Sequence, residues 1–352
     1  MRRENHKCFS PAGLNKSKGI TSMIKKSGYE VTVLSPSFVN NKTGKVYRSF
    51  YEKYNEYDLY HSLIWDIPYI NMLTSILWIS CTLVKQRHSY DKILFYNYTP
   101  ETAIPAFFAK IILRKEIYLE YEDGYFALDI FKPLKWLIAI NEKIGNNLIS
   151  GAILVTENLR QRVKTKNIQV IPGIIDQKLY NHFSKLSQKR DAKKVIMYSG
   201  GLDEIRGIDI LLDVAEEIIN EIEGDYEFWV TGKGPLEQMV HYYAKRFPDK
   251  IHYYGFVSKN KLLGLYEYAD AFVSLQKPEH KFSAFSSPSK VYEFISTGKF
   301  CIGLIDLKIN SDNYIYMKDL ESLKSTLVNI INGSYNKPSI ALPHNPQIHI
   351  FQ

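Results

Sequence analysis

Apolar runs of strand length alternate with stretches of helical length along almost the whole chain. In the first half the predicted strands are Val31–Ser35, Lys92–Tyr96, Glu116–Glu120, Ala152–Val155 and Ile168–Ile171, and the predicted helices are Gly19–Ser27, Pro100–Leu113 and Phe131–Ile149. In the second half the predicted strands are Val195–Ser199, Tyr226–Thr231, Ile251–Tyr254, Ala271–Leu275 and Phe300–Leu304, and the predicted helices are Gly207–Ile222, Pro235–Phe247, Lys259–Tyr268 and Pro288–Gly298. Several strands are continuously apolar, which is typical of strands covered on both faces. The alternation predicts parallel, doubly wound α/β sheets.

This pattern extends over 352 residues, which is too long for one ordinary domain and predicts two. We expect an N-terminal Rossmann-like domain at residues 1–175, a polar and basic linker at 176–194, and a C-terminal Rossmann-like domain at 195–340. A Rossmann-like domain normally opens on a strand, yet Met1–Lys18 holds no apolar run able to form a central one. The N-terminal domain therefore either lacks its first strand or opens on a different element.

The longest apolar run, Tyr69–Val84, contains Asn71, Thr74 and Ser75 and is shorter than a bilayer span. It predicts a buried or interfacial helix. Met1–Ser17 is polar and basic without the apolar region of a signal peptide, so we expect a cytoplasmic protein that is soluble or peripheral on the membrane. The three cysteines, Cys8, Cys81 and Cys301, form no CxxC pair, which argues for a reducing compartment and against structural zinc.

The net charge of +8 is concentrated locally, because residues 151–200 hold ten Lys and Arg against three Asp and Glu. Such a stretch suits anionic lipid or a diphosphate-bearing substrate, and it is equally typical of a solvated linker. No zinc-finger spacing, recognition-helix pattern or aromatic-basic RNA motif accompanies it, so we expect no nucleic-acid partner.

The first segment with chemical content is Met197–Asp209, in which a predicted strand runs into Gly200 and Gly201 and Arg206 precedes the next helix. Parallel α/β sheets bind ligands beyond the carboxyl ends of their strands. A glycine turn with a cation beside a helix start fits a diphosphate, although an ordinary strand-to-helix turn with a surface arginine has the same pattern.

The second segment is Pro278–Gly298, where Ser287 followed by Pro288 predicts a capped helix start. We expect Ser287, Ser289 and the free amides that follow Ser287 to face phosphate oxygens. Lys290 in the first turn opposes the helix dipole and so indicates an anionic ligand, and Glu293 is placed to accept hydrogen bonds from a ribose diol. The alternative is a surface helix with an incidental Lys290–Glu293 pair.

Together these segments resemble the nucleotide-binding half of GT-B glycosyltransferases, specifically family 4, the group 1 enzymes of capsule, exopolysaccharide and lipopolysaccharide (O-antigen) synthesis. The resemblance covers about residues 195–305 and continues at Thr231–Pro235 with Gly232, at His252–Val257 with Gly255, and at Tyr266–Asp270. The N-terminal half resembles the family only in architecture and in the segment Pro11–Lys18. This segment, with Gly13, resembles the glycine loop that lies next to the donor phosphates in the family.

The resemblance implies two Rossmann-like domains facing across a cleft and a retaining, metal-independent transfer from a nucleotide-diphosphate sugar without a cofactor. Arg206 takes the place of a phosphate-binding lysine and Glu293 that of a ribose-binding glutamate. Phe285 stands where the family's first glutamate belongs, and Gly201 where many members carry an arginine. Lys290 is expected to supply the missing positive charge.

For the acceptor side, Tyr118–Gly124 is a strand that ends in acids, and Asp123 is the candidate group to bind or deprotonate an acceptor hydroxyl. A turn with solvated acids explains the pattern equally well. We expect a lipid-linked oligosaccharide acceptor and an anionic membrane surface as partners. One rival is a non-catalytic GT-B subunit of a glycan assembly complex. A dehydrogenase is disfavoured, because Gly232-Lys-Gly234 lacks the third glycine of a dinucleotide-binding loop.

Overall fold

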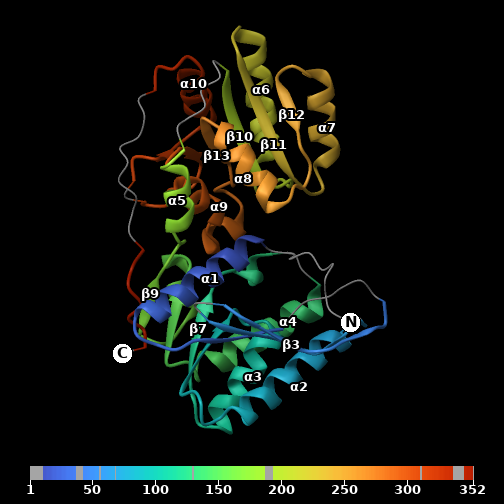
Figure 1. The fold of residues 1–352 in the computed structure, drawn as a ribbon, viewed down its shortest axis with the longest axis vertical. Helices are drawn as coiled ribbons and strands as arrows, with labels where there is room; N and C mark the ends of the chain where they lie inside the picture. The colour runs from blue at the N-terminus through green and yellow to red at the C-terminus, as the bar shows by residue number, and fades with distance from the viewer. Residues whose placement is uncertain are drawn as a thin grey trace. The chain divides into compact units, whose positions relative to one another are not determined.

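The computed structural model describes residues 11–36, 43–54, 57–67, 69–128, 131–186, 193–309, 311–335 and 345–351, and the side chains of these residues from Lys16 onward. The chain divides into two compact units (Figure 1). Unit 1 consists of Met1–Pro172, Ala284–Ser287 and Pro346–Gln352, and unit 2 of Gly173–Ser283 and Pro288–Asn345.

Unit 2 is built on a six-stranded parallel sheet in the order β12-β11-β10-β13-β14-β15. Its strands are β10 (Lys194–Gly201), β11 (Tyr226–Lys233), β12 (Ile251–Tyr253), β13 (Ala271–Ser274), β14 (Phe300–Gly303) and β15 (Tyr314–Tyr316). Its helices are α5 (Gln177–Phe183), α6 (Ile208–Glu221), α7 (Glu237–Arg246), α8 (Lys259–Tyr268), α9 (Ser289–Ile295) and α10 (Leu320–Ile331). The strand order reverses between β10 and β13, which is the point where open α/β sheets bind ligands.

The sheet of unit 2 is covered on both faces, as its apolar strands predict. Leu211 of α6 and Leu327 of α10 pack into the core on one face. Tyr266 of α8, Phe294 of α9 and Leu179 of α5 pack into the core on the other. The prediction of a doubly wound α/β fold is therefore confirmed.

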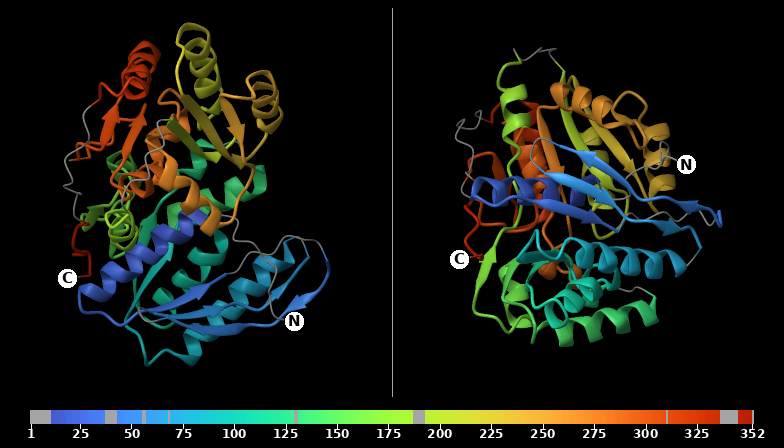
Figure 2. Two further views of the ribbon diagram at one scale, coloured as in Figure 1. Left: turned by 45° about the horizontal axis from the view of Figure 1, so that its top comes forward. Right: turned by 60° about the horizontal axis from the view of Figure 1, so that its bottom comes forward.

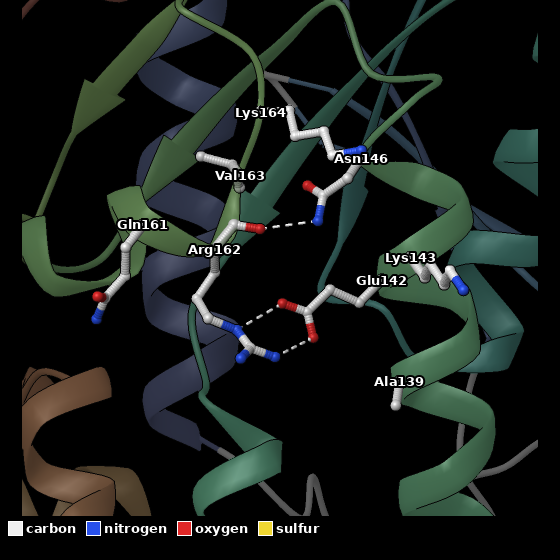
Figure 3. Close-up of a pocket in the computed structure, with 8 residues that line it drawn as sticks. All are labelled: Ala139, Glu142, Lys143, Asn146, Gln161, Arg162, Val163 and Lys164. Carbon is white, nitrogen blue, oxygen red and sulfur yellow. Dashed lines mark hydrogen bonds and ion pairs between the residues drawn. The ribbon is translucent and has the colours of Figure 1, made fainter.

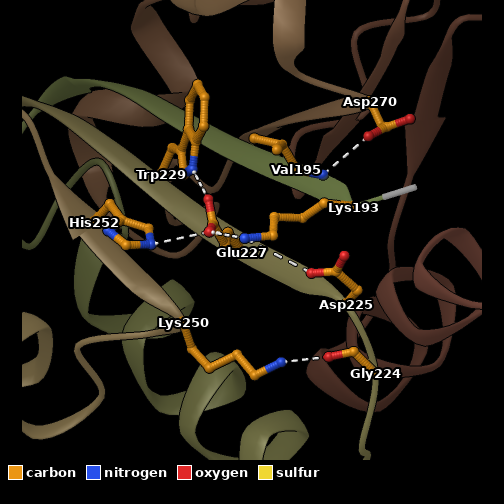
Figure 4. A network of polar contacts seen from close by, with 9 residues as sticks. All are labelled: Lys193, Val195, Gly224, Asp225, Glu227, Trp229, Lys250, His252 and Asp270. Atoms are coloured by element: carbon orange, nitrogen blue, oxygen red, sulfur yellow. Dashed lines mark hydrogen bonds and ion pairs between the residues drawn. The ribbon is translucent and has the colours of Figure 1, made fainter. Parts of the chain in front are cut away.

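The amino ends of the unit 2 strands are held together by an ion-pair network around Glu227 (Figure 4). Its carboxylate accepts hydrogen bonds from Lys193 Nζ at 2.6 Å and from Trp229 Nε1 at 2.7 Å, and it lies 3.3 Å from His252 Nε2. Polar groups at this edge thus neutralise one another, whereas the opposite, carboxyl edge carries the glycines of the predicted site.

Unit 1 contains a four-stranded parallel sheet, a three-stranded mixed sheet in the order β1-β4-β3, and the antiparallel pair β2-β5. The parallel sheet has the order β6-β7-β8-β9, with β6 (Lys92–Tyr96), β7 (Glu116–Tyr121), β8 (Gly151–Leu154) and β9 (Ile168–Val170). The smaller strands are β1 (Thr32–Ser35), β2 (Val46–Tyr47), β3 (Phe50–Lys53), β4 (Asp58–His61) and β5 (Ile64–Trp65).

The longer helices of unit 1 are α1 (Pro11–Lys26), α2 (Ile70–Lys85), α3 (Pro100–Ile111) and α4 (Lys132–Gly145). Both α2 and α4 contact α3, so the three form one helical layer (Figure 2). None of the helices in the described part of the chain is long and apolar enough to span a bilayer.

The segment Pro346–Phe351 completes unit 1 from the far end of the sequence. Phe351 packs edge-on against Tyr118 of β7 and Tyr29, and Asn167 Nδ2 donates to the Ile350 carbonyl at 2.7 Å. Ile348 and Ile350 are both buried. This segment is therefore part of the fold of unit 1 and no loose tail.

Two expectations about local structure differ from what is observed. The glycine loop expected at Pro11–Lys18 is the first half of α1, which buries Ile20, Met23 and Ile24 at helical spacing. The described part of the segment expected as a linker, 176–186 and 193–194, contains α5, because Asp176 Oδ1 caps the amides of Lys178 and Leu179 at 2.9 and 3.0 Å. Cys8 lies outside the described residues.

Candidate functional site

The carboxyl edge of the unit 2 sheet is shaped by close packing of glycines from two neighbouring strands. Gly200 at the end of β10 is paired with Gly232 at the end of β11. Gly232 has φ 140°, and a Cβ atom there would lie 1.9 Å from the Gly200 carbonyl oxygen. The Gly232 amide donates to the Gly255 carbonyl at 3.0 Å, and Gly255 has φ 67°. The backbone at this edge is therefore bare of side chains, which allows a ligand to approach it closely.

Arg206 lies in the turn between β10 and α6, with half of its side chain exposed. Its guanidinium pairs with Asp203, whose carboxylate also accepts from the Arg206 amide at 3.0 Å. The stem of Arg206 lies over Gly201, since a Cβ atom at Gly201 would be 3.1 Å from Arg206 Cδ. Arg206 thus fills the space that a side chain at position 201 would otherwise occupy.

Lys290 and Glu293 of α9 form a compact hydrogen-bonded group with Tyr266 of α8. Glu293 Oε1 accepts from Lys290 Nζ at 3.0 Å and from the Tyr266 hydroxyl at 2.9 Å, and Lys290 Nζ also donates to the Tyr266 hydroxyl at 3.1 Å. Among the described residues nothing bonds to the second oxygen of Glu293. The Lys290–Glu293 pair that was the alternative explanation of the sequence pattern does form, but both side chains are also hydrogen-bonded to Tyr266.

Tyr266 ties this group to the end of β10. Its ring is completely buried, and burial followed by the charge of Glu293 raises the pKa of its hydroxyl well above the ordinary value, while a hydrogen bond with the Ser199 side chain acts in the opposite direction. Ser199 directly precedes the glycine turn Gly200–Gly201. The hydroxyl of this buried phenol is therefore close to the end of β10, where the first of the two segments singled out in the sequence begins its turn.

The start of α9 differs from the expectation. The helix begins at Ser289, its N-cap is Pro288, and no side chain caps it, so the predicted cap by Ser287 is wrong. The Ser287 hydroxyl is instead buried without a hydrogen-bond partner among the described residues. Pro288 has ψ 83°, outside the helical range, as is usual for the N-cap residue of a helix.

Phe285, which stands where the resemblance implies a glutamate, is partly buried and packs against the core of unit 1. Its ring packs against Phe126 at 4.8 Å, and the Gly124 amide donates to its carbonyl at 3.1 Å. A Cβ atom on Gly124 would lie 2.5 Å from Phe285 Cβ. Position 285 thus serves apolar packing in this chain, a role that a carboxylate could not fill.

A second polar group lies at the carboxyl end of β7 in unit 1. Lys16 of α1 forms an ion pair with Glu122 and donates to the Ile171 carbonyl at 2.9 Å, and both charged side chains are buried. Glu120 is buried, with a relative exposure of 5%, and its Oε1 has no hydrogen-bond partner among the described residues. Burial, together with repulsion from Glu122, raises the pKa of Glu120 far above its ordinary value, although Lys16 lowers it.

Asp123 borders this group. The Asn97 side chain accepts from the amides of Glu122 and Asp123 at 2.8 and 3.2 Å, and its Nδ2 lies 3.4 Å from Asp123 Oδ2. Asn97 adopts φ 52°, a left-handed conformation that asparagine tolerates. The turn is therefore held by specific hydrogen bonds, which a turn of merely solvated acids does not need. The backbone of Gly13 is in the first turn of α1.

A surface hollow beside α4 contains none of the predicted site residues (Figure 3). Glu142 at its centre accepts two hydrogen bonds from Arg162, at 2.8 and 2.7 Å, and Lys143 and Lys164 line its rim. Because Arg162 neutralises Glu142, the hollow keeps the positive charge of the two lysines.

Comparison with known proteins agrees with this geometry. Residues 181–298 match the family Glycosyl transferases group 1. The chain is a glycosyltransferase of the GT-B fold. The matched region holds Arg206, Lys290, Glu293 and Tyr266, so the hydrogen-bonded group described above belongs to the glycosyltransferase domain. A comparison with curated proteins finds no match.

Solved structures support the fold at low sequence identity. The sucrose-phosphate synthase from Thermosynechococcus elongatus is 13% identical, with a TM-score of 0.63 over 90% of this chain and 83% of that one. A trehalose-6-phosphate synthase is 11% identical, with a TM-score of 0.62 over 92% and 89%. Anabaena Alr3699/HepE in complex with UDP is 15% identical, with a TM-score of 0.56 over 81% and 79%.

Several residues of these polar groups were not identified as site residues from the sequence. Tyr266 carries no local motif that marks it as a partner of Glu293, because the two residues meet only through the packing of α8 against α9. Lys16 and Asn97 are likewise separated from Glu122 by long stretches of chain. For Tyr266, the one available signal was its place in a segment that resembles the family.

Proposed function

We propose that this glycosyltransferase is a retaining, metal-independent enzyme that moves a sugar from a nucleoside-diphosphate donor to a lipid-linked glycan in bacterial surface polysaccharide synthesis. The observation that carries the proposal is the group Lys290–Glu293–Tyr266, which is anchored beside the glycine turn at the switch point of a parallel sheet.

Glu293 is proposed to hold the ribose. Its Oε1 is fixed by Lys290 and by the buried Tyr266, which leaves Oε2 to accept from a ribose hydroxyl. A carboxylate that is already oriented loses little freedom when the ligand binds. The neighbour Alr3699/HepE binds UDP, and we propose a uridine-type or related nucleoside diphosphate for this chain as well.

Arg206 and Lys290 are proposed to bind the diphosphate, with the bare backbone of Gly200, Gly201, Gly232 and Gly255 beside them. Negative charge grows on the diphosphate as the sugar–phosphate bond breaks, and fixed cations stabilise that charge in the transition state. In this proposal, the two side-chain cations stabilise the negative charge that a divalent metal ion stabilises in other transferases. Retention is supported by the trehalose-6-phosphate synthase neighbour, which was studied for glycosyltransfer with retention.

On the acceptor side, we propose that Asp123 contacts the acceptor hydroxyl, and we keep Gly13 as a candidate donor-binding position. The hydrogen bonds from Asn97 support a fixed position for the 122–123 turn. A lipid-linked acceptor requires an enzyme at the inner face of the cytoplasmic membrane, to which the basic stretch of residues 151–200 would contribute.

The proposal is tested by thermal shift with a panel of nucleoside diphosphates and their sugars, followed by transfer to a lipid-linked acceptor. We expect stabilisation by one nucleotide series and turnover with the matching sugar. Stabilisation without transfer or donor hydrolysis would favour the non-catalytic subunit instead. Lack of any nucleotide effect would contradict the donor site itself.

A further inference from the structure

The outer face of α2 is apolar over three turns. Leu73, Leu77 and Cys81 are exposed at four-residue spacing, while Ser75, Ile79 and Leu83 form the buried face. The helix carries no charged residue before Lys85. A helix that is apolar on every side is normally covered on every side, so this outer face indicates a missing neighbour.

The outer face of α4 has the same character. Trp136, Ile140 and Ile144 repeat at four-residue spacing, and the indole of Trp136 is 76% exposed, the largest exposure of any large apolar side chain described. The two helices are linked at their N-terminal ends, where the rings of Tyr69 and Phe131 lie 6.2 Å apart. We call the exposed apolar residues of both helices the apolar face: Tyr69, Leu73, Leu77, Trp136, Ile140 and Ile144.

The charges around the apolar face have one sign. In α2, α3 and α4 the only acids are Glu101 and Glu142, and both are buried. The exposed charged residues of these helices are Lys85, Lys132 and Lys143. The adjoining hollow adds the cation of Lys164, with Glu142 already bound to Arg162 (Figure 3). Apolar and aromatic side chains rimmed by lysines match the interface of an anionic bilayer.

We propose that the apolar face docks on the surface of anionic membranes, with Trp136 and the leucines of α2 inserted at the headgroup level and Lys132 and Lys143 paired with lipid phosphates. This inference deepens the proposed peripheral location and rests on it, yet it is tested by binding alone, without sugar transfer. It names the surface of unit 1 that faces the lipid.

The test is flotation of the full chain with vesicles of phosphatidylcholine and phosphatidylglycerol in equal parts, against phosphatidylcholine alone. We expect flotation with the anionic vesicles at low salt and weaker flotation at high salt, where charges are screened within a few ångströms. The double variant Leu77→Glu/Trp136→Glu should lose flotation, because it places charge in the inserted face. Lys132→Gln and Lys143→Gln should each weaken binding roughly fivefold.

The matched control is Tyr242→Glu, which changes a residue on α7 that is 59% exposed, close to the 65% of Leu77, and should float like the parent. Equal flotation with neutral vesicles, no flotation, or normal flotation of the double variant overturns the proposal. So does a concentration-dependent dimer that the double variant abolishes, since the face would then join two copies of the chain. The thermal stabilisation of the double variant by UDP is measured separately and tests whether the proposed donor site binds a nucleoside diphosphate.

Discussion

Glu293→Gln is the substitution that tests the proposed donor site most directly. The amide keeps the shape of the side chain and an oxygen that accepts from Tyr266, but it removes the negative charge that Lys290 and a ribose hydroxyl share. Hydrogen bonds to a charged group contribute about 1.5–3 kcal/mol, and 1.4 kcal/mol corresponds to a factor of ten. Donor kcat/KM should therefore fall roughly ten- to a hundredfold, mainly through KM for the donor.

Stability should change far less than donor affinity. The side chains of Lys290 and Glu293 are 23% and 18% exposed, so water screens their ion pair, and its loss should cost at most about 1 kcal/mol. Urea unfolding measures this cost, and isothermal titration with the nucleoside diphosphate measures affinity. Acceptor KM should remain close to that of the parent.

Glu216→Gln is the matched control, because Glu216 is 23% exposed and pairs with Arg246 at 2.6 Å between α6 and α7. It should lose a similar amount of stability and bind the donor normally. If Glu293→Gln binds donor and transfers sugar like the parent, or if both variants lose donor affinity equally, the assignment of Glu293 to the ribose is refuted.

Three further predictions follow from the same geometry. A nucleoside diphosphate should stabilise the protein by about 2.7 kcal/mol at a hundredfold excess over Kd in the presence of EDTA, and a strict need for added Mg²⁺ or Mn²⁺ would contradict the metal-free proposal. Gly232→Ala should cost about 1–3 kcal/mol in urea unfolding, because its Cβ would meet the Gly200 carbonyl, whereas Gly255→Ala, with open space around it, should cost less. Folding raises the pKa of Glu120 from 4.5 to about 8, so above pH 4.5 the folded protein keeps a proton on Glu120 that the unfolded chain releases. The free energy of unfolding should therefore fall as the pH rises from about 4.5 to about 8, and Glu120→Gln should remove that part of the fall.

Much of the fold could be predicted from the chain because its strands are continuous apolar runs. β6 and α8 have the predicted ends, and most other predicted elements differ by one to a few residues. The short strands β2 to β5 were missed, since they are mostly polar or half-exposed and depend on pairing with distant segments. Gly13 was expected in a loop because Pro11–Lys18 resembles the family's glycine loop, but the helix that buries Ile20, Met23 and Ile24 at helical spacing already begins at Pro11.

The site was predictable only where its residues share one local segment. Lys290 and Glu293 are one helical turn apart, so their pairing follows from spacing alone. The anchoring by Tyr266, and the salt bridge between Lys16 and Glu122, arise from tertiary packing that no spacing encodes. The donor-binding roles of these residues stay predictions until the variants are measured.

The burial of Pro346–Phe351 in unit 1 has a consequence for how the polypeptide is made and divided. On the ribosome, the first 172 residues emerge long before Ile348, Ile350 and Phe351, so unit 1 lacks part of its core until unit 2 has been synthesised in full. A fragment cut at the boundary near residue 173 would carry an open apolar surface at Tyr29 and Tyr118. A fragment of unit 1 for biophysical work would therefore need residues 346–351 joined to it through a flexible linker, and it would still lack Ala284–Ser287, whose Phe285 packs against Phe126.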